Sequence, residues 1–461
     1  MTNKNTLSVT DFVNHEHKEF SVVNSIRQIP SIIDGLKPSQ RKVLFSAIEY
    51  GKEELVDRLA MFSAARTAYK SGGDNLSGVV VNMARGFQGT NNIPYFDRDG
   101  QFGSIVSKEA ASVRYISVSV SKVISAIFKK EDNDILEHYY LGDEKMDPKF
   151  FLPVLPMILI NGVSAIGSGY ASDIPNHSVK SVINALKCLL DGREHTPLIP
   201  HYEGFTGVSQ YDSEGRVYVE GVYQLINATT LKITDVPPGK FSKTYEMKYL
   251  LPLVKDGTVI EYINDTNELN GWDITVQFKR GVLSSMSPDE IREMLGLVTR
   301  TSSTLVAWDE NGYIRPYASV DEILIDFFNY RLSRYEDRRQ HMMASIRSKM
   351  AELDKMRMFI GYITNTDLNK NISELKSYFL DNYKLYHVRD TISLHCDSMS
   401  MTEADVDRMF KISLSSISLD ARERLSARLQ EMLKQLQTLE NQTDVDLYKE
   451  DIKIVEKELG L

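Results

Sequence analysis

The chain has 461 residues, of which 42% are hydrophobic and 25% are charged. This length is sufficient for two to four domains, and the composition excludes a wholly disordered chain. The longest apolar run, at 151–160, contains two prolines and is too short to cross a bilayer, and the N-terminus lacks an apolar secretion signal. Two cysteines, Cys188 and Cys396, are too few for a disulfide framework or a metal site. We therefore expect a cytoplasmic protein with no membrane association.

The net charge of −9 is unevenly distributed along the chain. Residues 27–114 contain 12 Lys and Arg against 9 Asp and Glu, a net charge of +3, which leaves −12 for the remainder. Nucleic-acid affinity depends on a local basic surface rather than on the total charge. A small positive excess in one window also arises by chance, so this observation permits a nucleic-acid partner without identifying one.

The first 150 residues are predicted to be mostly helical, with loops between the helices. Pro38 begins a helix whose apolar face carries Val43 and Leu44, and Gly51 ends it. The residues QRK at 40–42 lie on the polar face of this helix. The pattern fits a helix-turn-helix and equally a solvated surface helix.

Residues 200–316 are predicted to combine strands and turns. Alternating apolar and polar residues predict strands over 216–224 and 230–235, and a Pro-Pro-Gly stop signal follows at 237–239. The run WDITVQF at 272–278 predicts a further strand.

The stretch beyond Pro316 is predicted to be helical, because it contains no proline and only two glycines, Gly361 and Gly460. Two segments within it show the three–four apolar spacing of a coiled-coil seam. They surround residues 364–420. We expect an antiparallel arm with a small domain at its tip, and the alternative is a compact helical bundle. The first seam comprises Ile325, Phe328, Leu332, Tyr335, Met342 and Ile346, and the second comprises Leu425, Leu429, Met432, Leu436 and Leu439.

Several catalytic motifs are absent or incomplete. The sequence has no GxxxxGK[ST] phosphate loop, and the run GSG at 167–169 lacks the third glycine of a dinucleotide fingerprint. Ser164 is not followed by the glycine of a nucleophile elbow. The run DRD at 97–99 has the spacing of paired metal ligands but is expected in a solvated loop. His395 and Cys396 have no partners at zinc spacing.

Three phrases remain that are improbable together. The first is RQIP at 27–30 with DGLKPSQRKVL at 34–44, the second is DGQFGS at 99–104 with AASVRY at 110–115, and the third is LINGVSAIG at 159–167 with DIPNH at 173–177. In this order and spacing they resemble the breakage–reunion part of type IIA DNA topoisomerases, the gyrase A-like subunits. The resemblance extends from residue 12 to the end and weakens past residue 200.

This resemblance implies a multidomain α+β fold that is mainly helical. The implied parts are a winged-helix DNA-cleavage domain at 12–155, an α/β tower domain at 156–320, and an antiparallel coiled-coil arm with a helical dimerisation gate. The arm has an outgoing helix at 321–363 and a returning helix at 421–459, with the gate at 364–420. A cleavage subunit of this length most resembles those of the T-even phage enzymes, which would place it in a bacterial host, and the alternative is a piece of a longer protein.

The resemblance also implies the site residues. The family has its catalytic tyrosine directly after an arginine, which corresponds here to Arg114 and Tyr115. A tyrosine nucleophile conserves the phosphodiester energy in a phosphotyrosyl bond to the DNA 5′ end. A fixed guanidinium stabilises the extra charge of the pentavalent phosphate, and Arg114 and Arg27 are the candidates for this role.

Four further residues correspond to DNA contacts of the family. Ile166 matches an isoleucine that enters between base pairs and bends the duplex, although a core isoleucine is the alternative from the residue alone. Lys37, Arg41 and Lys42 match contacts to the DNA backbone, with a solvated helix face as the alternative.

The implied cofactors and partners are Mg²⁺, ATP, double-stranded DNA and a second copy of the chain. We find no convincing metal carboxylates and no phosphate loop in the sequence, so a Toprim/ATPase large subunit is expected to bind Mg²⁺ and ATP in trans. The cellular enzymes carry histidine in the loop that corresponds to residues 69–74. Here the loop reads YKSGGD, and Gln40 replaces the histidine of gyrase-like proteins, so the general base is left open.

Two interpretations compete with an ATP-dependent topoisomerase subunit that cleaves and religates DNA. One is a DNA-binding scaffold without cleavage activity, against which the intact Arg114–Tyr115 pair argues. The other is a tyrosine recombinase, which would need a dispersed Arg/His constellation that the three phrases do not supply.

Overall fold

The computed structural model describes residues 8–366, 371–386, 401–411 and 419–461. The chain divides into two compact units, Met1–Leu332 with Tyr448–Leu461 and Ser333–Leu447. Two helices, α13 (Val320–Asn365) and α17 (Asp444–Leu459), run from one unit into the other. Cys396 and parts of the predicted tip domain at 364–420 lie outside the described residues.

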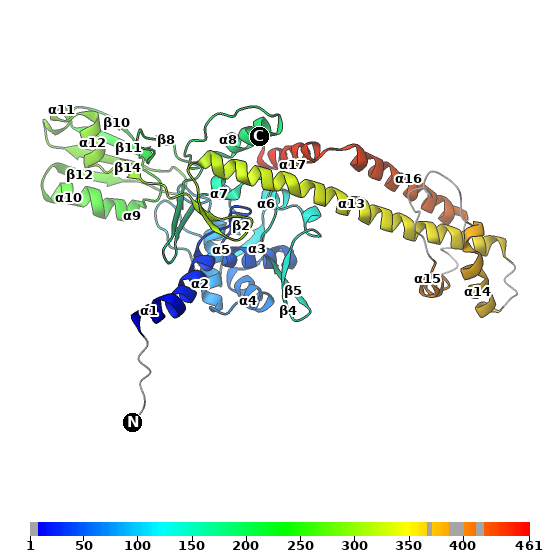
Figure 1. Ribbon diagram of the computed structural model, residues 1–461. Helices are drawn as coiled ribbons and strands as arrows, with labels where there is room; N and C mark the ends of the chain where they lie inside the picture. Colours follow the sequence, from blue (N-terminus) through cyan, green and yellow to red (C-terminus); the bar gives the residue numbers. More distant parts are fainter. Residues whose placement is uncertain (1–7, 367–370, 387–400, 412–418) are drawn as a thin grey trace, which may run out of the picture. The chain divides into compact units, whose positions relative to one another are not determined.

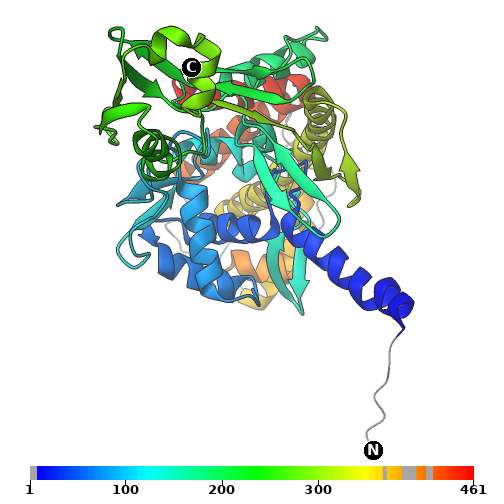
Figure 2. The ribbon, with the colours of Figure 1, turned by 90° about the vertical axis from the view of Figure 1, so that its left-hand side faces the viewer.

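The N-terminal segment is a nearly continuous helix that projects from the first unit (Figures 1 and 2). It consists of α1 (Val9–Phe12), a π-helical turn η1 (Val13–His17) and α2 (Lys18–Gln28). Its first residues are exposed to solvent, and it becomes buried only near Ser25.

Three helices and a small antiparallel sheet follow. The helices α3 (Pro38–Tyr50), α4 (Val56–Arg66) and α5 (Gly73–Ala84) pack on one another. The strands β1 (Glu54–Leu55), β2 (Phe96–Asp99) and β3 (Ser117–Val120) form a sheet in the order β1-β3-β2. The shared core contains Val43, Leu44, Leu59, Val80 and Val118.

The limits of α3 agree with the sequence prediction. Pro38 is its first residue, because the fixed φ of proline suits a first turn in which no amide partner is needed. The Gln40 side chain accepts from the Lys37 amide at 2.9 Å, and Gly51 ends the helix in the left-handed region, with φ 72°. The loop predicted at 97–99 was wrong: these residues form β2, because they pair with 117–119 of β3.

Short elements connect this part to the larger sheets. A hairpin of β4 (His138–Leu141) and β5 (Glu144–Pro148) follows the helix α6 (Lys122–Ile127) and the turn η2 (Lys130–Asp132). A second hairpin of β6 (Val163–Ile166) and β7 (Ala171–Ile174) lies between α7 (Met157–Ile160) and α8 (Val179–Leu190).

Asparagine side chains link these segments. Asn161 donates to the Ile93 carbonyl oxygen and accepts from the Ile93 amide, both at 2.8 Å. Asn92 donates to the carbonyl oxygen of His177, and Asn176 donates to that of Thr90. Because buried backbone polar groups need partners, these amides explain the asparagines in the third phrase: they join segments far apart in the sequence.

The remainder of the first unit is dominated by strands. The alternating stretch predicted at 216–224 is divided at Gly221 into two strands, which belong to different sheets. A four-stranded antiparallel sheet has the order β10-β11-β13-β12 and a three-stranded sheet has the order β14-β9-β8. The buried cluster on the four-stranded sheet includes Ile233, Tyr245, Trp272 and Val276. The strands are β8 (Val208–Tyr211), β9 (Val217–Glu220), β10 (Val222–Leu225), β11 (Thr230–Asp235), β12 (Val259–Asn264), β13 (Ile274–Phe278), β14 (Val298–Thr301), β15 (Val306–Trp308) and β16 (Ile314–Pro316). The helical elements are α9 (Ser242–Tyr245), η3 (Glu246–Leu250), α10 (Leu251–Lys255), α11 (Val282–Ser285) and α12 (Pro288–Met294).

The second unit is helical, as the absence of breakers predicted. The helix α16 (Leu419–Asn441) lies beside α13 (Figure 1), where Met350 of α13 and Leu429 and Leu436 of α16 form a buried cluster. Arg347 and Glu440 form an ion pair at 2.8 Å across the two helices. A separate core surrounds Phe359 and contains residues of α14 (Ile372–Asn382) and α15 (Glu403–Met409), and η4 (Tyr383–Tyr386) follows α14.

Candidate active site

Tyr115 lies at the end of a turn that leads directly into β3. The Tyr115 amide closes the turn by donating to the Ser112 carbonyl oxygen at 2.9 Å, and the side chain is 76% exposed. Ile116 is buried beneath the turn, close to Gly100. A Cβ atom on Gly100 would come within 2.5 Å of the Ile116 side chain, and φ is 101° there. The second phrase therefore needs this glycine, because only glycine allows both the conformation and the close contact.

The first amides of α4 hold both sides of the turn. The Asp57 amide donates to the Val113 carbonyl oxygen at 3.3 Å, and the Val56 amide donates to that of Ile116 at 3.0 Å. These amides have no partner within the helix, so the turn satisfies them. The backbone around Tyr115 is thus fixed, while its side chain points into solvent.

Arg114 is exposed beside Tyr115. Among the described residues, neither the Arg114 guanidinium nor the Tyr115 hydroxyl has a hydrogen-bond partner. An approaching phosphate would therefore displace no protein contact of either group.

Arg27 lies at the end of α2 and lines a basic hollow of about 660 Å³ together with Lys37, Lys42 and Lys70. Arg27 donates from Nη2 to the Ser71 hydroxyl at 3.3 Å. Neither Arg114 nor Tyr115 lines this hollow. The structure therefore does not bring Arg27 into one hollow with the Arg114–Tyr115 pair.

Lys37 connects the hollow to the β6–β7 hairpin. Its Nζ donates to the Ser164 carbonyl oxygen at 3.3 Å, and partial burial lowers the pKa of Lys37. Desolvation disfavours the charged ammonium. A phosphate placed here would stabilise that charge, which water solvates only in part.

Arg41 does not lie on the solvated face that the sequence suggested. Its guanidinium is buried and forms two hydrogen bonds to the Asp34 carboxylate, at 2.6 and 2.9 Å, and one to the Leu36 carbonyl oxygen at 3.0 Å. The pairing with Asp34 outweighs the burial that would lower the pKa of Arg41 and raises it overall. A direct contact to DNA phosphate would require this arrangement to be broken, so the structure argues against the predicted role of Arg41.

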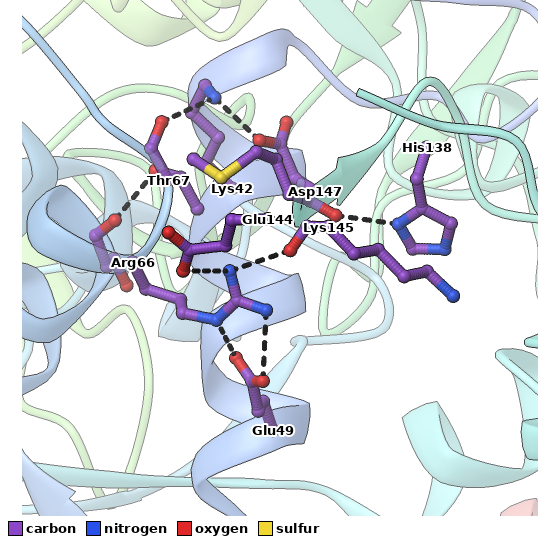
Figure 3. Close-up of polar contacts among 10 residues, drawn as sticks. Lys42, Glu49, Arg66, Thr67, His138, Glu144, Lys145 and Asp147 are labelled. Atoms are coloured by element: carbon purple, nitrogen blue, oxygen red, sulfur yellow. Dashed lines mark hydrogen bonds and ion pairs between the residues drawn. The ribbon is translucent and has the colours of Figure 1, made fainter. Parts of the chain in front are cut away.

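Lys42 also makes its contacts within the protein (Figure 3). Its Nζ donates to Asp147 of β5 at 2.7 Å and to the Thr67 carbonyl oxygen at 3.1 Å. Arg66 binds Glu49 at 2.6 Å in the same region. These contacts fasten the β4–β5 hairpin to α3 and α4. Lys42 lines the basic hollow with a charge that Asp147 already balances, which weakens the expectation of a phosphate contact.

Ile166 is 83% exposed at the end of β6. This exposure excludes the alternative of a core isoleucine within this chain. Two residues of α2 support the hairpin beside it: Asn24 accepts from the Ser168 amide at 2.9 Å, and the Ser25 hydroxyl donates to the Ser168 carbonyl oxygen at 3.2 Å. An exposed apolar side chain on a braced hairpin has the placement that a wedge between base pairs requires.

The described residues contain no group of three or more His, Cys, Asp or Glu side chains that could hold a metal ion. A helix long and apolar enough to cross a membrane is likewise absent from the described part of the chain.

Comparison with known proteins identifies the class. The family model for the A subunits of DNA gyrase and topoisomerase IV matches residues 27–458. The chain therefore belongs to this family. A crystal structure of the Plasmodium falciparum topoisomerase II DNA-binding, cleavage and re-ligation domain has a TM-score of 0.88 and 28% identity, covering 98% of this chain and 65% of that one.

The similar curated proteins are type II topoisomerases by name. DNA topoisomerase 2-alpha of Gallus gallus is 29% identical over 99% of this chain and 31% of its own length. DNA topoisomerase 2-beta of Homo sapiens is 29% identical over 98% and 30%. DNA topoisomerase 2 of Bombyx mori is 34% identical over 77% and 23%. The chain thus spans less than a third of the length of these relatives.

Proposed function

We propose that this chain cleaves and religates DNA as part of a type IIA topoisomerase, with Tyr115 as the nucleophile. The observation that carries the proposal is the Tyr115 side chain, which is exposed on a turn that the backbone amides of α4 hold rigidly. A nucleophile must reach the phosphate while its backbone stays in place, because small misplacements cost large factors in rate.

The proposed step is a transesterification at the DNA phosphate. The Tyr115 oxygen forms a bond to phosphorus, the bond from phosphorus to the 3′ oxygen breaks, and the departing oxygen takes a proton to become a 3′ hydroxyl. The DNA 5′ phosphate is then esterified to Tyr115, and the reverse step reseals the strand. Arg114 donates to the phosphate oxygens as their charge increases. The group that accepts the tyrosine proton is not assigned.

We propose the following organisation for the chain. Residues 12–155, with α3, α4, α5 and the β1-β3-β2 sheet, form a winged-helix domain, and residues 156–320 form a tower domain. The helix α13 forms a coiled-coil arm with the returning segment at 421–459, which is two helices, α16 and α17, and not the single helix expected. Residues 364–420 form a gate that joins two copies. The element order helix–strand–helix–helix–strand–loop–strand in 38–120 supports the first assignment.

A homodimer is part of the proposal, because two opposite strands need two tyrosines and a twofold pair supplies one to each. Mg²⁺ and ATP would be bound by a Toprim/ATPase region outside this chain, and the unmatched two thirds of the relatives supports this. A large partner protein, like the one that the medium subunit of the T-even phage enzyme works with, is one form of such an arrangement. Ultracentrifugation tests the dimer: a monomer at micromolar concentration would refute it.

The decisive experiment traps the covalent intermediate. The chain, together with its Toprim/ATPase partner, is incubated with duplex DNA and Mg²⁺ and then denatured, and the peptide attached to DNA is identified by mass spectrometry. We expect attachment at Tyr115 through the 5′ phosphate. Tyr115→Phe should abolish the adduct but retain DNA binding, because only the hydroxyl is removed. Wild-type protein that binds DNA without any adduct would favour the scaffold alternative.

A further inference from the structure

Arg85 is a buried arginine at the end of α5 whose side chain reaches the long loop between β2 and β3. Its Nε donates to the Phe102 carbonyl oxygen at 2.9 Å, and its Nη2 donates to that of Lys108 at 2.7 Å. The third contact, from Nη1 to the Asn82 side chain at 2.6 Å, fixes the guanidinium to α5. One side chain therefore holds two points of the loop that are six residues apart.

The two carbonyl oxygens lie at the narrow neck of the segment 102–108. The Ser104 amide donates to the Ser107 carbonyl oxygen at 2.8 Å within this segment. Gly103 has φ 94°, and a Cβ atom there would come within 2.8 Å of the Lys108 carbonyl oxygen. The two sides of the neck thus approach each other closely, and the Arg85 guanidinium bridges them.

The neck is connected to the turn that carries Tyr115. The Ala111 amide donates to the Gln101 carbonyl oxygen at 2.9 Å, so a backbone hydrogen bond also joins the two sides of the loop just beyond the neck. The Gln101 side chain accepts from the Gly103 amide and donates to Glu268 at 2.7 Å. The turn itself begins one residue later, at Ser112.

We propose that Arg85 is a positioning residue for Tyr115, because its guanidinium clamps the neck of the loop that presents the nucleophile. The proposal rests on the assignment of Tyr115 as the nucleophile. In this role Arg85 would touch neither DNA nor the reacting atoms. It acts by holding the loop at Phe102 and Lys108, whereas the amides of α4 hold the turn that follows.

The chemistry of the contacts explains why arginine stands here. The guanidinium carries five N–H donors in a fixed plane, which lets it serve three acceptors in different directions. A lysine ammonium or a glutamine amide of this reach cannot reproduce all three contacts. No carboxylate of the described residues lies within ion-pair distance of Arg85, and burial lowers the pKa of Arg85. Burial therefore destabilises the charged guanidinium, and its strong, oriented hydrogen bonds offset this destabilisation.

The positive charge of Arg85 also suits a second role, the binding of a DNA phosphate, and the experiment must distinguish this role from the clamp. Arg85 and Lys108 line a hollow of about 420 Å³ together with Asn82, Asn91 and Asn161. A phosphate in this hollow would make Arg85 a DNA ligand rather than a clamp. The two roles differ in their dependence on salt, because each lost phosphate contact lowers the salt slope of DNA affinity by about one.

The test compares Arg85→Gln and Arg85→Lys with a control, Arg98→Gln. The control removes an exposed arginine from β2, the strand that precedes the loop. The single-turnover rate of adduct formation is measured at saturating DNA with the Toprim/ATPase partner present, and DNA affinity is measured over a range of salt concentrations. We expect Arg85→Gln to slow adduct formation roughly 10- to 100-fold, with unchanged affinity and salt slope. Arg85→Lys should recover part of the rate, and Arg98→Gln should behave like the wild type.

Hydrogen exchange of the full chain without DNA gives a readout that is independent of cleavage. Arg85→Gln should accelerate exchange of the 101–115 amides while those of α8 keep their protection. Unchanged exchange in that loop would overturn the clamp, as would a lower salt slope with an unchanged rate at saturation. If the wild type forms no Tyr115 adduct, the proposed function fails, and exchange still decides whether Arg85 restrains the loop. If Arg85→Gln does not fold, Arg85→Lys is judged by the same two measurements.

Discussion

The Asp34 carboxylate is the centre of a buried network that Arg41 completes. Besides the two hydrogen bonds from Arg41, it accepts from the Leu36 amide and from the Phe151 amide, each at 3.0 Å. The residue pair therefore joins the start of α3 to a segment more than a hundred residues later. This relationship gives Arg41 a structural role within the chain.

Arg41→Ala is expected to lower the free energy of unfolding by about 3–5 kcal/mol, because it leaves the Asp34 carboxylate buried without its cation. Denaturant unfolding followed by circular dichroism measures this loss. The salt slope of DNA affinity, measured at a temperature where the variant is folded, should not change. A stable Arg41→Ala protein with a reduced salt slope would restore the phosphate contact that the sequence suggested.

Lys37→Ala is expected to have the opposite pattern. Lys37 lines the basic hollow and has only a carbonyl partner, so its loss should weaken binding to all DNA sequences and lower the salt slope by about one. Unfolding should change by less than for Arg41→Ala. The matched control is Lys52→Ala, whose exposed ammonium lies over the Tyr50 ring after α3. Equal effects of both lysines on DNA affinity would mean that the hollow is not a specific site.

Arg114→Ala is expected to reduce the rate of adduct formation about 10²- to 10³-fold, with a much smaller effect on DNA affinity. The reason is that the proposed contact strengthens as charge accumulates on the phosphate. Arg58→Ala provides the control, since Arg58 is exposed on the same α4 that supports the turn. Equal losses of rate and affinity would identify Arg114 as a simple backbone contact.

Some helix limits and strand positions could be predicted because they depend on local residues, whereas β2 (Phe96–Asp99) could not, because it depends on pairing with the distant β3. Pro38 and Gly51 define α3 through their own backbone preferences, and the alternation in 230–235 gives β11. The direction of a charged side chain on α3 could not be predicted, because it depends on a distant partner. Lys42 turns inward since Asp147 lies 105 residues later and folds back onto it.

The candidate site shows the same division. The phrases around Tyr115 and Ile166 located both residues, but their exposure is known only from the fold. The bracing residues Arg85 and Asn161 gave no local signal, because their acceptors are carbonyl oxygens, which every residue carries.

His177 makes stability depend on pH. It is fully buried, and burial lowers its pKa to about 4, whereas an unfolded histidine titrates near 6.5. The native state keeps the ring neutral while the unfolded state takes up a proton, so its contribution is complete above about pH 6.5 and is lost as the pH falls towards 4. We expect a loss of about 3 kcal/mol over that window. Urea unfolding at pH 7 and pH 4 measures this loss, and His177→Gln should show a weaker dependence on pH. An equal dependence in both proteins would mean that other groups dominate.

Ile166→Ala is expected to straighten the bound duplex while leaving the protein as stable as the wild type. The side chain is 83% exposed, so its truncation removes little buried surface. Unstacking a base step costs a few kcal/mol. The short alanine side chain cannot fill the space between the unstacked base pairs, so it cannot offset this free energy. Energy transfer between labels at the two DNA ends measures the bend, and thermal unfolding measures stability. Ile160→Ala is the matched control, because Ile160 lies six residues earlier and is fully buried in α7. This variant should lose about 2–5 kcal/mol of the free energy of unfolding. An unchanged bend in Ile166→Ala, or a fall in its melting temperature like that of Ile160→Ala, would rule out the wedge.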